Sequence, residues 1–187
     1  MTKRQPFAPL ATRPNLNPKP FDPNAQTFVP DNSLDTSKVR ELSVTKVKML
    51  GAKVYNSATQ SITSNTNWHT VTFDTNTFDQ GNLWRVSDPT KLTIPYAGIW
   101  TVSAFLSYED NTADYRHMQI LAGATTLIRT VNSAITGFQT DLFLSADFKF
   151  VAGRVLTVQT RQQSGSTLNI ADGEDDNFFS AVFRGPV

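Results

Sequence analysis

The stretch KLTIPYAGIWTVSAFLSY, residues 91–108, contains two apolar runs separated by the segment Pro95-Tyr-Ala-Gly98. Within its second run, side chains of two kinds alternate. One face of a strand would carry Trp100, Val102, Ala104, Leu106 and Tyr108, and the other Thr101, Ser103 and Ser107. Successive side chains of a strand point to opposite sides of its sheet, so the pattern predicts a strand with one face in a core. Proline and glycine predict a turn before it.

Similar short runs, separated by turn residues, continue through residues 51–187. Besides Gly98–Tyr108, the segments expected as strands are Ala52–Ser57, Trp68–Phe73, Lys91–Ile94, Tyr115–Leu121, Thr125–Val131, Phe138–Phe150, Arg154–Arg161 and Asn177–Arg184. In the segment Phe138–Phe150, one side of the strand is expected to carry Phe138, Leu142, Leu144, Ala146, Phe148 and Phe150. Many short strands without a helical apolar pattern predict an all-β fold of the two-sheet jelly-roll type.

The final strand has apolar residues on both faces. Phe179, Ala181 and Phe183 would lie on one face, and Phe178 and Val182 on the other. Two interpretations fit this pattern. The strand is buried between the core and a neighbouring subunit, or it is a central strand of an ordinary core.

Residues 1–33 have a different composition. Seven of the ten prolines lie in the first thirty residues, and no glycine precedes Gly51. Proline removes backbone donors and favours extended geometry in the residue before it, so an extended N-terminal arm is expected. The arm carries apolar side chains at intervals, namely Phe7, Leu10, Leu16, Phe21, Phe28 and Val29. A disordered tail is one interpretation, but we favour an arm that docks these side chains on another protein.

Residues 34–50 contain a short repeat that is expected to form a neck between arm and body. Leu34-Asp-Thr-Ser-Lys-Val-Arg40 is followed by Leu42-Ser-Val-Thr-Lys-Val-Lys48, with a period of eight residues. Strand spacing and helical spacing both fit it. The repeat resembles the short repeats of bacteriophage fibre stalks.

Charge and composition exclude several classes of function. Residues 1–50 carry eight Lys/Arg and four Asp/Glu, a net charge of +4, whereas residues 51–187 carry nine and twelve, a net charge of −3. The basic residues of the arm do not cluster with aromatic ones, so no nucleic-acid partner is expected. The absence of cysteine excludes disulfides and thiolate metal sites. We expect synthesis in the host cytoplasm and no membrane partner, since no signal-like or membrane-length apolar run occurs.

No arrangement of residues predicts catalysis. His69 and His117 lie far apart and lack the carboxylate spacing of a metal site. The acidic segment 172–176 and the group of Glu109, Asp110 and Asp114 have two interpretations, a Ca²⁺ site or simple acidic turns, and we favour turns. The chain is therefore expected not to be an enzyme and to need no cofactor or metal.

Three segments together resemble the sequence signature of the C1q/TNF-like superfamily: Lys91–Tyr108, Val151–Gln159 and Asn177–Phe183. The resemblance covers residues 51–187. It implies a C1q/TNF-like jelly-roll sandwich and a compact homotrimer, with Tyr55, Trp100, Phe179 and Phe183 in the core or near the threefold axis.

The sequence departs from this family in ways that suggest a function. Ala181 replaces the usual glycine of the closing motif, Arg154 replaces a common acidic residue, and a collagen stalk is absent. Cysteine-free domains with such leaders resemble bacteriophage virion proteins. We therefore expect a trimeric capsid decoration (cement) protein on the exterior of the virion, whose arms bind the major capsid protein of a phage shell and stabilise it. The alternative is a receptor-binding head or tail-fibre tip that attaches to the host surface.

Overall fold

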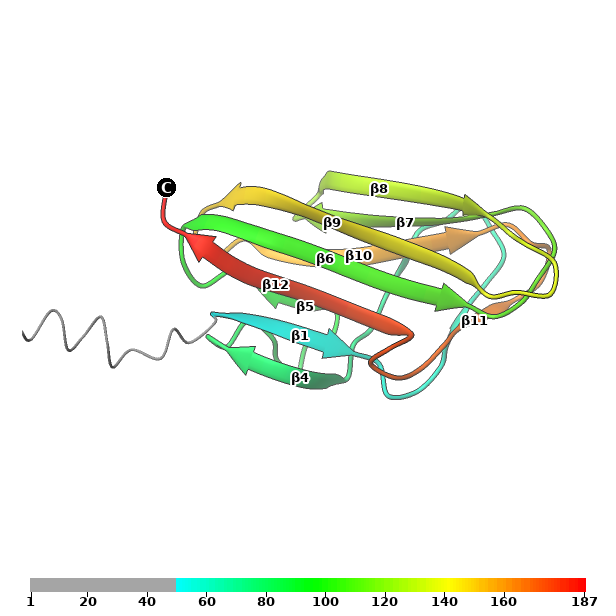
Figure 1. Ribbon diagram of the computed structural model, residues 1–187, viewed down its shortest axis with the longest axis horizontal. Helices are drawn as coiled ribbons and strands as arrows, with labels where there is room; N and C mark the ends of the chain where they lie inside the picture. Colours follow the sequence, from blue (N-terminus) through cyan, green and yellow to red (C-terminus); the bar gives the residue numbers. More distant parts are fainter. Residues whose placement is uncertain (1–49) are drawn as a thin grey trace, which may run out of the picture. The chain divides into compact units, whose positions relative to one another are not determined.

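The computed structural model describes residues 50–187, which form a β-sandwich of twelve strands (Figure 1). The strands are β1 (Gly51–Tyr55), β2 (Gln60–Ile62), β3 (His69–Thr70), β4 (Thr75–Gln80), β5 (Lys91–Thr93), β6 (Gly98–Tyr108), β7 (Tyr115–Ala122), β8 (Thr125–Ser133), β9 (Thr140–Phe150), β10 (Val155–Gln162), β11 (Leu168–Ile170) and β12 (Asn177–Gly185). In this part of the chain, no helix is long and apolar enough to cross a membrane.

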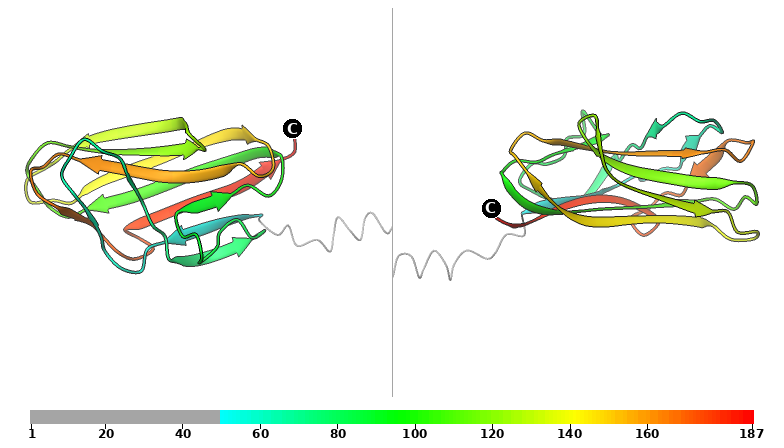
Figure 2. Two further views of the ribbon diagram at one scale, coloured as in Figure 1. Left: turned by 180° about the vertical axis from the view of Figure 1, so that it is seen from behind. Right: turned by 90° about the horizontal axis from the view of Figure 1, so that it is seen from above.

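The strands form two sheets that lie face to face (Figure 2). The seven-stranded sheet has the order β2-β11-β6-β12-β1-β4, and β9 also pairs with β6. The five-stranded sheet has the order β3-β10-β7-β8, with β5 also paired to β10. Every pair of named strands is antiparallel. The all-β, two-sheet prediction is therefore confirmed.

The core lies between the sheets and follows the alternation of the strands. In β6, Trp100, Val102 and Ala104 are fully buried, and Phe179 and Ala181 of the neighbouring β12 are buried beside them. The intervening residues of both strands therefore point away from the core, because side chains alternate along a strand. The expected division of the last strand into two faces is present.

The turn before β6 explains the Pro-x-x-Gly pattern. Gly98 has a φ of 155°, and a Cβ placed there would meet the ring of Phe183 and come within 2.5 Å of the carbonyl oxygen of Gly185. The same turn gives Trp100 a hydrogen bond, since its indole Nε1–H donates to the carbonyl oxygen of Tyr96 at 3.1 Å. The glycine lets the chain approach β12 closely enough to start the central strand.

Replacing Gly98 by Ala should lower the free energy of unfolding by about 1–3 kcal/mol, because the new methyl group is strained by φ and by the backbone of β12. Thermal or denaturant unfolding would measure the change. Gly185→Ala is the control, because a Cβ at Gly185 would meet nothing within 4 Å. Equal stability of the two variants would contradict this account of the turn.

The structure also differs from the sequence-based prediction in places. Phe138 was expected on the buried side of its strand, but this expectation is wrong. It lies in the turn before β9 with 69% of its side chain exposed. The segment 68–73 forms only the two-residue strand β3. The strands β2, β4 and β11 were not predicted. The arm (1–33) and the neck, except Leu50, lie outside the described residues.

Candidate subunit interface

The outward face of the seven-stranded sheet carries a row of aromatic side chains. Phe105 of β6 lies between Phe178 of β12 and Phe143 of β9. Tyr55 of β1 follows Val54, which pairs with Phe179, so the antiparallel register places Tyr55 next to Phe178. We call Tyr55, Phe178, Phe105 and Phe143 the aromatic row. It crosses four neighbouring strands.

The row remains partly open to solvent. Phe143 is 57% exposed, and the other three side chains are partly buried. The rings of Phe105 and Phe178 stack with centroids 6.0 Å apart and an interplanar angle of 21°. Aromatic side chains bury large apolar areas and dominate the energetics of interfaces, and a contiguous exposed apolar patch marks an interaction site. The row is thus the main candidate surface for contact with another subunit.

Buried hydrogen bonds fix the position of β12 and therefore of the row. Asn177, the first residue of β12, is fully buried. Its Oδ1 accepts a hydrogen bond from the backbone N–H of Asn56 at 2.6 Å, and its Nδ2 donates to the carbonyl oxygen of Ala171 at 2.6 Å. Because a buried polar group without a partner is costly, these bonds specify the register that brings Phe178 beside Phe105.

Polar residues surround the row on the same face. The hydroxyls of Ser103 and Ser145 lie 2.7 Å apart, and Thr101 donates a hydrogen bond to Asp147. On the other side, Ser107 donates to Asp141 at 2.7 Å. An apolar centre with a polar rim is the usual anatomy of a protein interface.

Lys53 connects the row to the acidic loop before β12. Its Nζ donates to Glu174 Oε1 at 2.9 Å and lies 4.8 Å from the centre of the Phe178 ring. The hydrogen bond from Lys53 is the main cause that lowers the pKa of Glu174. Such exposed pairs add little stability, so its effect is to hold a charge at the edge of the aromatic row.

The acidic segment 172–176 forms a turn. Gly173 has a φ of 94°, and its carbonyl oxygen accepts hydrogen bonds from the backbone N–H groups of Asp176 and Asn177. Glu109, in the other acidic group, accepts from the N–H and Nδ2 of Asn169 at 2.9 and 3.1 Å. Among residues 50–187, no three His, Cys, Asp or Glu side chains gather in a way that could hold a metal ion.

The four residues assigned to the core or the threefold axis lie in different surroundings. Trp100 and Phe179 are fully buried between the sheets. Phe183 is partly buried, with its ring 5.2 Å from that of Trp100. Tyr55 alone points outward and belongs to the aromatic row. The six apolar residues of the arm, Phe7, Leu10, Leu16, Phe21, Phe28 and Val29, lie outside the described residues.

Sequence reasoning missed the centre of the row. Phe105 interrupts the polar face of its strand between Ser103 and Ser107, and Phe143 stands between Asp141 and Ser145. A large aromatic residue among small polar ones on a solvent-facing strand is a detectable signal. Only the register shows what this signal means, because it places Phe105 beside Phe178 on one side and beside Phe143 on the other.

The two histidines have separate partners. Nε2 of His69 lies 3.2 Å from Oδ1 of Asn65. The ring of His117 meets the ring of Trp68 edge to face, with centroids 6.3 Å apart. Neither contact resembles a base oriented toward a nucleophile.

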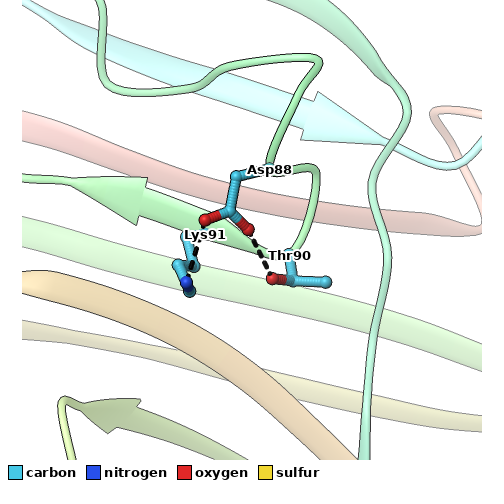
Figure 3. Close-up of polar contacts among 3 residues, drawn as sticks. All are labelled: Asp88, Thr90 and Lys91. Atoms are coloured by element: carbon cyan, nitrogen blue, oxygen red, sulfur yellow. Dashed lines mark hydrogen bonds and ion pairs between the residues drawn. The ribbon is translucent and has the colours of Figure 1, made fainter.

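A further charged group lies in the loop before β5. Asp88 accepts hydrogen bonds from Nζ of Lys91 at 2.8 Å and from Oγ1 of Thr90 at 3.0 Å (Figure 3). Both bonds lower the pKa of Asp88, and the bond from Lys91 has the larger effect. The group borders a hollow of about 480 Å³ that is also lined by Leu83 and Pro95. Two of the three charged side chains of the lining, Asp88 and Lys91, already pair with each other, and the third, Arg85, does not by itself indicate a ligand.

Comparison with known proteins supports the fold alone. No family model matches the sequence, and no curated protein is similar to it in sequence. Among solved structures, murine APRIL at pH 5.0 is 13% identical, with a TM-score of 0.58 over 73% of this chain and 100% of that one. Eiger TNF from S. frugiperda is 12% identical, with a TM-score of 0.55 over 75% and 95% of the two chains. The globular domain of zebrafish complement 1qA protein is 10% identical, with a TM-score of 0.56 over 74% and 99%. The described part of the chain is therefore a two-sheet sandwich that resembles the C1q/TNF fold.

Proposed function

We propose that this chain is a structural virion protein. Three copies form a decoration (cement) protein on the exterior of a bacteriophage capsid. The N-terminal arms bind the major capsid protein and stabilise the shell. Catalysis, metal ions, cofactors, nucleic acid and membranes have no part in this function.

The observation that carries the proposal is the aromatic row. Proteins with the C1q/TNF fold commonly form trimers. A closed threefold assembly needs an apolar surface on each subunit that a neighbour covers. The row supplies such a surface at the centre of the seven-stranded sheet, with polar residues around it. This supports the interpretation that β12 is covered on both sides, by the core and by a neighbouring subunit.

The pairing of the first and last strands determines where the described body begins. Gly51 pairs with Val182, so β1 begins at the end of the sandwich where β12 finishes. Cyclic symmetry places equivalent ends of all subunits on the same side of the assembly. Three arms would then leave together toward the shell. Linked binding segments raise each other's effective concentration, so overall binding can exceed that of one arm by about 10²–10⁴-fold.

Deleting residues 1–33 should leave the oligomeric state unchanged and abolish binding to capsids. Co-sedimentation with undecorated phage shells would measure binding, and light scattering would measure the mass. A second variant keeps the arm but replaces its six apolar residues by Ser, and it should bind about as weakly as the deletion. Undiminished capsid binding by the deletion would refute the role of the arm.

The second candidate is a receptor-binding head or fibre tip. It is favoured by the basic aromatic surface on the five-stranded sheet that is described below. Copy number distinguishes the two functions, because a decoration protein covers the shell whereas a fibre tip occurs at a few positions. Quantitative mass spectrometry of purified particles would give this number.

A further inference from the structure

A cluster of basic and aromatic side chains lies on the outward face of the five-stranded sheet. Arg161 of β10 is paired with His117 of β7, and Arg129 of β8 is paired with Gln119 of β7. Trp68 comes directly before β3, whose His69 pairs with Thr160, so Trp68 lies beside Arg161. We call Trp68, His117, Arg129 and Arg161 the basic cluster. Its members come from four strands or their ends.

Both arginines lie close to the indole ring of Trp68. The guanidinium carbon of Arg161 lies 4.8 Å from the centre of the Trp68 ring, and that of Arg129 lies 5.1 Å from it. A cation within about 6 Å of an aromatic ring is attracted to its face. The amide of Gln119 fixes Arg129 further, because its Oε1 accepts from Nη2 of Arg129 at 2.9 Å. The cluster is thus ordered before any ligand binds.

Among residues 50–187, no carboxylate forms an ion pair with either arginine of the cluster. The ion pairs among residues 50–187 are Lys53–Glu174 and Lys91–Asp88, and neither involves these arginines. The buried Nε of Arg161 has no hydrogen-bond partner in the same part of the chain. The cluster is basic although residues 51–187 as a whole carry a net charge of −3. Two arginines that lie 4.8 and 5.1 Å from the same indole ring, and that form no ion pair among residues 50–187, therefore make a local positive surface that an anion would complete.

His117 adds a hydrogen-bonding group to this surface. Burial is the main cause that lowers its pKa, and the charges of Arg161 and Arg129 lower it further, while Asp114 opposes them. The lowered pKa of His117 favours the neutral imidazole. A neutral imidazole can both donate and accept a hydrogen bond, as the hydroxyl groups of a ligand require.

We propose that the basic cluster binds an acidic saccharide, a sugar unit that carries a carboxylate or a sulfate. Arg129, which is exposed, and Arg161 would bind the anion, because guanidinium groups pair with such oxygens through two donors. The partly buried indole of Trp68 would contact the apolar face of the ring. The neighbouring Thr70, Gln159 and Thr126 present amides and hydroxyls that suit sugar hydroxyls.

The surroundings favour a saccharide over an acidic peptide. A peptide often binds by adding a strand to a free sheet edge. The two strands beneath the centre of the cluster, β7 and β10, are each paired on both sides, whereas Trp68 and Arg129 come from the outer strands β3 and β8. At the centre of the cluster, only side chains are therefore available to a ligand. This inference uses the sandwich alone and is independent of the arm and of the capsid.

The experiment measures binding of the full-length protein to soluble oligomers by isothermal titration calorimetry. The probes are a heparin oligosaccharide for sulfates, a polysialic acid oligomer for carboxylates, neutral dextran, and poly-glutamate. Arg129→Gln removes one charge from an exposed side chain, and Arg129→Lys keeps the charge but removes the planar guanidinium. Lys149→Gln is the matched control, since Lys149 is exposed on β9 of the other sheet.

The protein should bind at least one of the two acidic saccharides and not dextran. Arg129→Gln should weaken this binding about tenfold or more, because it removes a charged hydrogen bond. Arg129→Lys should weaken it less, and Lys149→Gln should leave it unchanged. The proposal is overturned if neither acidic saccharide binds, if dextran or poly-glutamate binds equally well, or if both Gln variants behave alike.

Discussion

Phe105→Asp should convert the proposed trimer into folded monomers. Phe105 is the centre of the aromatic row and stacks on Phe178. A carboxylate at this position would be buried without a partner when a neighbouring subunit covers the row. Leaving a charge buried and unpaired costs about 3–5 kcal/mol. In a threefold assembly the cost recurs at every interface. For the proposed decoration protein, the loss of linked arms should lower capsid binding by about 10²–10⁴-fold.

Light scattering gives the mass, and circular dichroism shows whether the sandwich is still folded. Phe143→Asp is a second test, because its side chain is 57% exposed and contributes little to the core. Thr125→Asp adds the same charge on exposed β8 of the other sheet and should leave the mass unchanged. If both row variants stay folded and trimeric, the row is not the subunit interface.

Phe179→Ala should destabilise the sandwich itself. Phe179 is fully buried, and its ring lies 5.6 Å from that of Phe73. Truncating a buried phenylalanine loses its transfer free energy and leaves a cavity, which together cost about 3–5 kcal/mol. Urea unfolding followed by fluorescence would measure the free energy of unfolding at one protein concentration, since the stability of an oligomer depends on concentration.

Phe138→Ala is the matched control for Phe179→Ala. The same atoms are removed, but 69% of this side chain is exposed in the turn before β9. Its effect should stay within about 0.5 kcal/mol, as is usual for surface changes. Equal costs for the two variants would mean that the assignment of faces along β12 is wrong.

The sequence was most informative where one face of a strand is fully buried. The bounds of β6 were predicted as Gly98–Tyr108, and the structure has the same bounds. The long alternation of apolar and polar residues makes this strand recognisable. It also determines which face is buried, because a shift of the register by one residue would expose every core side chain. The same reasoning separated Phe179 from Phe178 in β12. The resemblance to a fold at 10–13% identity also rests on this pattern rather than on shared residues.

Short polar strands could not be found in this way. β2 and β11 have three residues each, and β4 has mainly polar residues over Thr75–Gln80. Their pairing is supplied by longer neighbours, so their own sequence carries little periodicity. Phe138 shows the opposite error. This apolar residue was predicted to belong to the strand, but it lies in the turn before β9.

Both candidate surfaces depend on register, which a single sequence does not contain. Tyr55 and Phe178 are adjacent only because β1 pairs with β12. Trp68 and Arg161 are separated by more than ninety positions, and their contact requires β3 to pair with β10. The residue types could be read from the sequence, but their association could not.

The mass of the intact protein in solution tests the account most directly. One chain has a mass of 20.7 kDa. Light scattering coupled to size-exclusion chromatography should therefore give about three times this value for the full-length protein, as expected for a closed threefold assembly. A mass of 20.7 kDa at micromolar concentration would contradict it, because the aromatic row would then remain uncovered.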